Sequence, residues 1–271
     1  KGVKASSAEG KSFTGNELVD GLVAHSNKVI PVFERLKALG KKHIERKFFA
    51  DDSLIDFGSI ESDTLLNSFS EKTLLLYSTG EIILEGKYIE GNIKIVSEKR
   101  IEIKSSSTLN DILVYAPAVK ICNGFKGSLQ VYATDSVSLG KGCNLNYPSV
   151  IGVFVSENDS AQPYIRIRNR AKVNGVVFLY GKKKSSVFKP YIQIDPGALV
   201  SGQVVCTDNI QLCGKVEGSV FCNNFILKTS SSYYEQIIID GTIDFNALPV
   251  DYAGISSDKN NERRKPIKWL Y

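Results

Sequence analysis

Apolar residues change their spacing along the chain near residue 73. Between residues 16 and 47 they recur at helical spacing, with one interruption at Pro31. From Thr73 onward apolar residues alternate with polar ones, which is typical of β-strands that bury one face. Segment 48–72 has no clear period of its own. We therefore predict a mostly helical N-terminal region over 16–72, followed by an all-β part.

The composition of the two ends differs from that of the middle. The first fifteen residues are small, polar and rich in Gly and Ser, which predicts a flexible segment. The alternation stops near Pro249, and a polar stretch follows before the apolar, aromatic residues at 266–271. The predicted organisation is a flexible N-terminus 1–15, a helical cap region 16–72, a β-domain 73–248 and a C-terminal tail 249–271.

A repeated motif runs through the β-domain. An apolar-x-apolar triplet is followed, after a gap of three or five residues, by apolar-x-Gly-x-apolar. In residues 101–113, Asp111 stands where the other stretches have glycine. The motif occurs at residues 165–177, 192–204, 119–129, 210–220 and, in the Asp form, 101–113.

The spacing of the motif predicts a single-stranded parallel β-helix. Corresponding apolar residues recur every 16 to 18 residues, as from Ile101 to Val119 and from Val200 to Val216. A turn of that length, or rung, holds three short strands, and stacked rungs enclose a column of Val, Ile, Leu and Cys. The recurring Gly or Asp is expected to face outward or to lie at a corner, where a positive φ is easy for Gly and tolerable for Asp. Lys, Glu, Asn and Ser are expected to line the outside.

The residues that enzymes of β-helical type use are not arranged for catalysis here. Acyltransferases of the left-handed class need a His within the coils, but both His precede residue 44. Polysaccharide lyases and hydrolases need clustered carboxylates, and the aspartates of the β-domain read as turn residues. We predict a non-enzymatic protein with no catalytic residue, no metal site and no cofactor.

The five cysteines have no CxxC spacing and lie far from both His, which argues against zinc. We interpret them as buried free thiols, although neighbouring coils can also bring two of them close enough to bond. The net charge of +5, from 34 Lys and Arg against 29 Asp and Glu, does not indicate nucleic-acid binding.

Two interruptions of the repeat, at 143–164 and 181–191, predict loops that project from the β-helix. The second combines lysines with aromatic residues, and the tail ends in a basic run followed by the only Trp. These are candidate contact sites, with a plain exposed hairpin and a back-folded tail as the alternatives. The candidate interaction residues are Lys182, Lys183, Lys184, Phe188, Lys189, Tyr191, Trp269 and Tyr271.

Residues 192–220 resemble the bactofilins, the bacterial polymer-forming cytoskeletal proteins. The similarity rests on Gly197-Ala-Leu-Val-Ser-Gly202 and Gly214-Lys-Val-Glu-Gly-Ser-Val220, and it is loose over 80–245. It implies a right-handed triangular β-helix that polymerises end to end through exposed apolar rungs. The helical region, the long insertions and the tail depart from that pattern, and each can cap an end.

The predicted function is a structural scaffold or assembly protein of the bacterial cell envelope or cytoskeleton, with protein partners or self-assembly. The alternative is a carbohydrate-binding, adhesin-like β-helix protein or a degenerate polysaccharide lyase, with a polysaccharide as partner. The chain contains no Met and begins at Lys1, so we expect a trimmed fragment. A segment preceding Lys1 would then provide export or membrane attachment; a cytoplasmic location is the alternative.

Overall fold

The computed structural model describes residues 4–5, 10, 12–15, 17–22, 30–44, 53–156, 162–181 and 189–256. It divides into two compact units, Lys1–Ile30 and Pro31–Tyr271. In the first unit, the described residues hold no helix or strand, and the side chain of Leu22 is 94% exposed. All regular structure of the described chain therefore lies in the second unit.

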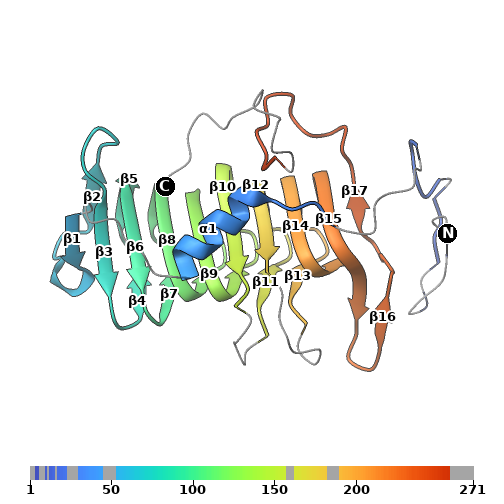
Figure 1. The fold of residues 1–271 in the computed structure, drawn as a ribbon, viewed down its shortest axis with the longest axis horizontal. Coiled ribbons are helices and arrows are strands. Elements are labelled where there is room, and N and C mark those ends of the chain that lie inside the picture. Colours follow the sequence, from blue (N-terminus) through green and yellow to red (C-terminus); the bar gives the residue numbers. More distant parts are fainter. Residues whose placement is uncertain are drawn as a thin grey trace. The chain divides into compact units, whose positions relative to one another are not determined.

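The described residues of the second unit form one α-helix and a large set of strands (Figure 1). The prediction of a mostly β chain with parallel strands and a small helical part is confirmed. The elements are α1 (Glu34–Ile44), β1 (Ser53–Asp56), a 3-10 turn (Phe57–Ser59), β2 (Thr64–Asn67), β3 (Leu74–Ser78), β4 (Ile82–Leu84), β5 (Tyr88–Gly91), β6 (Ile93–Ser97), β7 (Arg100–Ile103), β8 (Thr108–Ile121), β9 (Lys126–Leu139), β10 (Asn144–Phe154), β11 (Tyr164–Ile167), β12 (Lys172–Tyr180), β13 (Tyr191–Ile194), β14 (Leu199–Leu212), β15 (Lys215–Lys228), β16 (Tyr233–Glu235) and β17 (Thr242–Ile243).

The helical region is shorter than the sequence pattern predicts. Among the described residues of 16–72, only Glu34–Ile44 is α-helical, and β1 and β2 already belong to the sheet. β1 pairs in parallel with β3, and β2 pairs in parallel with β5. The pairing partners of these two strands lie more than twenty residues further along the chain, so local periodicity could not reveal them.

Helix α1 contains Gly40, although glycine often marks the end of a helix. A Cβ atom on Gly40 would lie 2.7 Å from the ring of Phe154, on β10. Glycine at this position therefore serves the close approach of the helix to the sheet rather than a C-cap.

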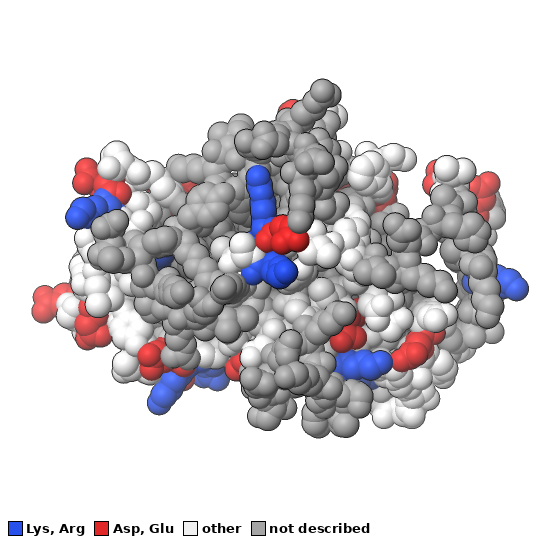
Figure 2. Space-filling model, in the orientation of Figure 1, with Lys and Arg blue, Asp and Glu red and all other residues white. Residues whose placement is uncertain are grey.

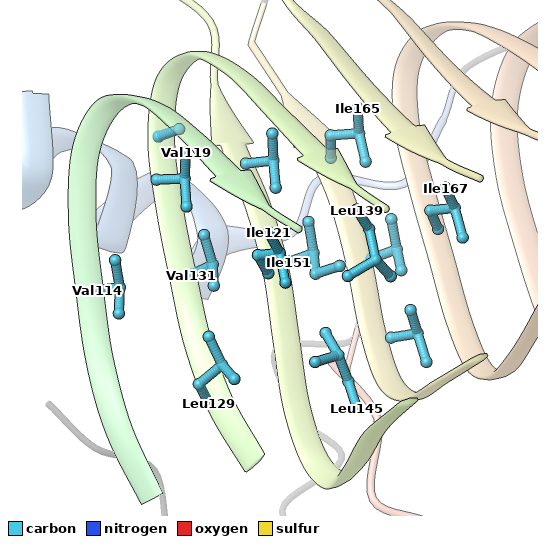
Figure 3. Packing of buried hydrophobic residues seen from close by; sticks show 14 of the residues in the cluster. Val114, Val119, Ile121, Leu129, Val131, Leu139, Leu145, Ile151, Ile165 and Ile167 are labelled. Carbon is cyan, nitrogen blue, oxygen red and sulfur yellow. The ribbon is translucent and has the colours of Figure 1, made fainter. Parts of the chain in front are cut away.

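Parallel pairing keeps the repeated motif in register from strand to strand. Val200 of β14 pairs with Val216 of β15, and Ile101 of β7 pairs with Val119 of β8. These partners are the residues that the repeat aligned. Their side chains point into one continuous apolar interior, which the strands enclose (Figure 3).

Three of the four recurring glycines have a positive φ, whereas Gly127 does not. Gly175, Gly202 and Gly218 are register partners with φ of 148°, 150° and 148°. A Cβ on each would lie 1.9 Å from the carbonyl oxygen of its partner in the preceding strand. Asp111, which replaces Gly in one motif, has a φ of 56°. At these positions the residue type follows from the positive φ of the backbone and, for the three glycines, from the close approach of the preceding strand.

One side of the sheet buries apolar residues on both of its faces. We call it the covered side; it comprises β3, β6 and residues 112–116, 129–133, 149–154, 175–180, 202–206 and 218–222. Tyr132, Phe154 and Phe178 are at most 1% exposed, lie outside the interior cluster and pack ring against ring, with centroids 5.1 to 6.1 Å apart. The expectation of a polar exterior is wrong on this side.

Helix α1 lies across the covered side in front of β9, β10 and β12 (Figure 1). Leu36 of α1 and the preceding Phe33 are at most 2% exposed, and the Phe33 ring meets Phe221 edge-on at 5.5 Å. The described residues 249–256 cover a second part of this side. Tyr252 donates its hydroxyl hydrogen to the carbonyl of Gly175 and accepts the N–H of Gln203, both at 2.9 Å.

Candidate functional site

Two of the predicted interaction residues, Lys189 and Tyr191, lie in the described part of the chain. Lys189 is exposed and forms a long ion pair with Glu235, 3.9 Å between Nζ and Oε1. Tyr191 opens β13, with its side chain on the outer face. The other six predicted residues lie outside the described residues: Lys182, Lys183, Lys184, Phe188, Trp269 and Tyr271.

Tyr191 belongs to a cluster that the sequence reasoning missed. β11 and β13 pair in register, so Tyr164 stacks on Tyr191 with centroids 5.8 Å apart and planes at 21°. The guanidinium of Arg166 lies 4.9 Å from the Tyr164 ring centre and donates to the Tyr191 hydroxyl at 2.7 Å from Nη2. We call these three residues the tyrosine–arginine cluster. The parallel motifs Tyr164-Ile-Arg-Ile and Tyr191-Ile-Gln-Ile could have indicated the stacking.

Further hydrogen-bonding groups continue from the cluster along the same outer face. Gln193, next to Arg166 in register, donates to Asp195 at 2.8 Å, and Arg168 lies 3.6 Å from the same carboxylate. These side chains are only partly buried. The cluster therefore presents aromatic, cationic and amide groups together, a combination that suits a hydroxyl-rich or anionic ligand.

A second candidate surface is formed by residues 53–67, which we call the β1–β2 end. All four residues of β1 are exposed, and the side chains of Leu54 and Leu66 are 66% and 67% exposed. Within the described chain, β1 pairs only with β3 and β2 only with β5. Among the described residues, no strand pairs with the opposite edge of either, and large apolar side chains lie beside it.

The backbone groups of this edge point outward in a definite pattern. The N–H of Ser53 donates to Thr73, and the carbonyls of Asp63 and Asn67 accept from Tyr88 and Asn92. Since backbone groups alternate sides along a strand, those of Leu54, Asp56 and Leu66 point away from β3 and β5. The β1–β2 end therefore offers donors and acceptors for a further strand.

The opposite end of the sheet is more fully paired. β16 folds back antiparallel on β15, and the N–H of Gln236 donates to the carbonyl of Phe225 at 2.6 Å. β17 adds in parallel to the start of β15, and the N–H of Gly218 donates to Asp244. Apolar exposure persists at Phe245, which is 67% exposed. Among the described residues, the outer edge of β15 is therefore paired near both ends of the strand, at Lys215–Val216 and Ile226–Lys228.

The best-defined charged group is Glu102 on β7, whose side chain is only 10% exposed. Its Oε1 accepts hydrogen bonds from Lys104 Nζ at 2.8 Å, Lys120 Nζ at 3.0 Å and Cys122 Sγ at 3.2 Å. These bonds lower the pKa of Glu102 to about 2. A carboxylate that stays ionised at neutral pH is poorly suited to proton transfer, so the arrangement ties neighbouring strands together.

All five cysteines are free thiols, and Cys143 and Cys206 are buried. Cys206 and Cys222 are register partners, and burial raises the pKa of Cys222 to about 12. Thiols with raised pKa values are weak nucleophiles, which fits small core side chains. The described residues contain no group of three or more His, Cys, Asp or Glu side chains that could hold a metal ion.

Comparisons with known proteins leave the family open. No protein-family model, no curated protein and no solved structure matches this chain. In the described part of the chain, no helix is both long and apolar enough to cross a membrane.

Proposed function

We propose that this chain is a bactofilin-like, single-stranded parallel β-helix that serves as a non-enzymatic structural scaffold. In this proposal the protein assembles with protein partners or copies of itself in the bacterial cell envelope or cytoskeleton. The in-register pairing of residues 16 to 18 positions apart, such as Val200 with Val216, supports the β-helical interpretation. Each turn of the chain would then form one rung of about three strands.

The observation that carries the assembly function is the open edge of the β1–β2 end. An exposed strand edge flanked by Leu54 and Leu66 is a template for pairing with another chain, and soluble proteins usually protect such edges. Assembly accounts for the apolar end without any further ligand.

The test is the molar mass of the protein as a function of concentration, measured by sedimentation velocity. We expect mass to increase with concentration, and Leu66→Lys to shift the increase to higher concentrations. Val32→Lys is the matched control, because Val32 is 53% exposed and precedes α1, outside the strands. A wild-type protein that stays monomeric throughout would refute the assembly function.

A carbohydrate-binding function is the second candidate, and the tyrosine–arginine cluster favours it. Stacked aromatic rings with a bridging guanidinium are suited to the apolar faces and hydroxyls of sugars. The test is binding of acidic and neutral polysaccharides by affinity electrophoresis. Retardation that is lost in Tyr191→Ala and retained in Tyr88→Ala, an exposed tyrosine on β5, would establish this function. Equal migration of all three proteins would eliminate it.

A further inference from the structure

The open edge of the β1–β2 end is acidic. The exposed residues of this end and of the adjoining turn include four carboxylates, Asp56, Glu61, Asp63 and Glu71. Lys87 pairs with Asp63 at 2.6 Å, and Lys72 is exposed nearby in sequence. Figure 2 shows red Asp and Glu side chains at the end of the molecule where β1 to β5 lie. An additional strand on this edge would be favoured if it carried positive charge.

One segment of this chain has the matching composition. Residues 262–271 read Glu-Arg-Arg-Lys-Pro-Ile-Lys-Trp-Leu-Tyr, with three consecutive basic residues before a mostly apolar run that contains a fourth, Lys268. Ile267, Trp269 and Tyr271 would share one face of a strand, and Lys268 and Leu270 the other. Pro266 precedes this run, so it would not remove a donor from the strand.

Chain length favours a segment from a second copy over the molecule's own. The N–H of Ile255 is bound to the side chain of Gln203, on β14 of the covered side. Seven parallel pairings separate β14 from β1, so a strand added beyond β1 lies about 38 Å away at the usual strand spacing. The residues from 255 to 266 span about 36–40 Å only when fully extended. Binding to β1 of the same molecule would thus require a fully extended connection. The tail leaves the sheet at β14, near the end opposite to β1, where it can reach the β1 edge of a second copy.

We propose that residues 267–271 of one copy add as a strand to the free edge of β1 in a second copy, with the preceding basic residues facing the acidic end. This inference rests on the proposed assembly function and specifies its contact. Each chain then has one donor segment and one acceptor edge, so assembly is head-to-tail and open-ended. Main-chain hydrogen bonds supply the pairing, and the burial of Leu54 and Trp269 strengthens it.

A mixing experiment with the full chain tests the proposal. Leu54→Pro removes an N–H that points to the open edge while keeping the bonds of Ser53 and Ile55 to β3, so it disables only the acceptor. Trp269→Asp disables only the donor, and Asn260→Ala is its matched control. Circular dichroism and thermal melting verify that each variant is folded. Should Leu54→Pro fail to fold, Asp56→Lys combined with Glu61→Lys replaces it.

We expect each disabled variant alone to assemble about tenfold more weakly, or not at all, in sedimentation velocity. A mixture of the two should form 1:1 dimers and nothing larger, because only one intact donor and one intact acceptor remain. Asn260→Ala should match the wild type. Raising the salt concentration should weaken wild-type assembly.

Three results would overturn the proposal. Wild-type assembly of Trp269→Asp would leave the scaffold function standing but remove this contact. Dimerisation of Trp269→Asp alone, lost on adding Leu54→Pro to the same chain, would indicate that two β1 edges pair with each other. A photo-crosslinker at position 54 that captures residues 267–271 only within the same chain, in a mixture of isotope-labelled and unlabelled protein, would show binding in cis.

Discussion

The register partners Gly175, Gly202 and Gly218 form a glycine ladder on the covered side. This ladder leads to a specific prediction for stability. Gly175 on β12 has a φ of 148°, a conformation that L-residues with a side chain rarely adopt. An added Cβ would lie 1.9 Å from the carbonyl oxygen of Ser149, and its three nearest atoms all belong to the Ser149 backbone. No flexible side chain can move aside, so the Gly175→Ala substitution must displace a strand.

The cost follows from two contributions. Backbone strain at such a φ is worth about 1–3 kcal/mol. Relief of the contact requires β10 and β12 to separate by roughly 1 Å, which weakens ladder hydrogen bonds worth about 1 kcal/mol each. We therefore expect Gly175→Ala to lower the free energy of unfolding by about 3–5 kcal/mol. For a domain of this size, the melting temperature should fall by roughly 10 °C.

Gly86→Ala provides the matched control. Gly86 also has a positive φ, 66°, but nothing lies within 4 Å of its added Cβ. This substitution should cost only about 1 kcal/mol. The assay is urea unfolding followed by circular dichroism for the three proteins. Equal destabilisation by the two substitutions would show that the close approach between strands contributes nothing, and the argument from the ladder would fail.

Three other perturbations test separate parts of the structure. The pKa of Glu102 is lowered to about 2 from an ordinary 4.5, so its contribution is complete above pH 4.5 and disappears as the pH falls from there towards 2. Glu102→Gln should therefore cost about 1–2 kcal/mol in urea unfolding at pH 7, with a difference from wild type that shrinks at pH 3; a constant difference would contradict the ion-pair explanation. Tyr252→Phe removes two hydrogen bonds and should cost about 1–2 kcal/mol, with faster hydrogen exchange at residues 249–256 and not at β7. Leu36→Ala should cost about 2–4 kcal/mol and increase proteolysis within α1, whereas Arg35→Ala, on the exposed face of the same helix, should change neither.

Much of the sheet could be predicted because the repeated residues reflect two local properties of each strand, namely which side chains are buried and where the preceding strand comes close. Alternation identified the inward residues, and the recurring glycine marked positions where a side chain would collide with the preceding strand. Asp111, which replaces glycine in one copy of the motif, has a positive φ, as Gly175 and Gly202 do. Periodicity succeeds here because each strand pairs with its neighbour in register, so one residue's environment resembles that of its counterpart.

The covered side could not be predicted in the same way. A strand that buries both faces reads as a continuous apolar run, as in Val176-Val-Phe-Leu179, and such a run does not distinguish inner from outer positions. The outward ring of Phe154 lies against Gly40 of α1, and this contact depends on the tertiary structure. The β1–β2 end escaped prediction for a related reason, because its strands are four residues long.

The candidate site was partly accessible from sequence. The interruption at 181–191 identified Tyr191 as a candidate. The sequence placed this residue in a projecting loop, whereas it lies at the start of β13. Tyr164 and Arg166 become visible only when two copies of the motif are superimposed and their outward positions compared. Stacking between neighbouring strands is a property of the register, which a single motif does not contain.

The contact between α1 and the covered side also sets an order of folding. Gly40 meets Phe154 across more than a hundred residues of chain, and Phe33 meets Phe221 across a still longer interval. During synthesis the helix emerges first, and its binding surface is complete only after β15 has formed. We expect the sheet to grow with this apolar side bare and α1 to dock last, since contacts that close such long loops form late. Until then the growing chain exposes Tyr132, Phe154 and Phe178 to other chains, so its yield in the cell should depend on chaperones more than its final stability suggests.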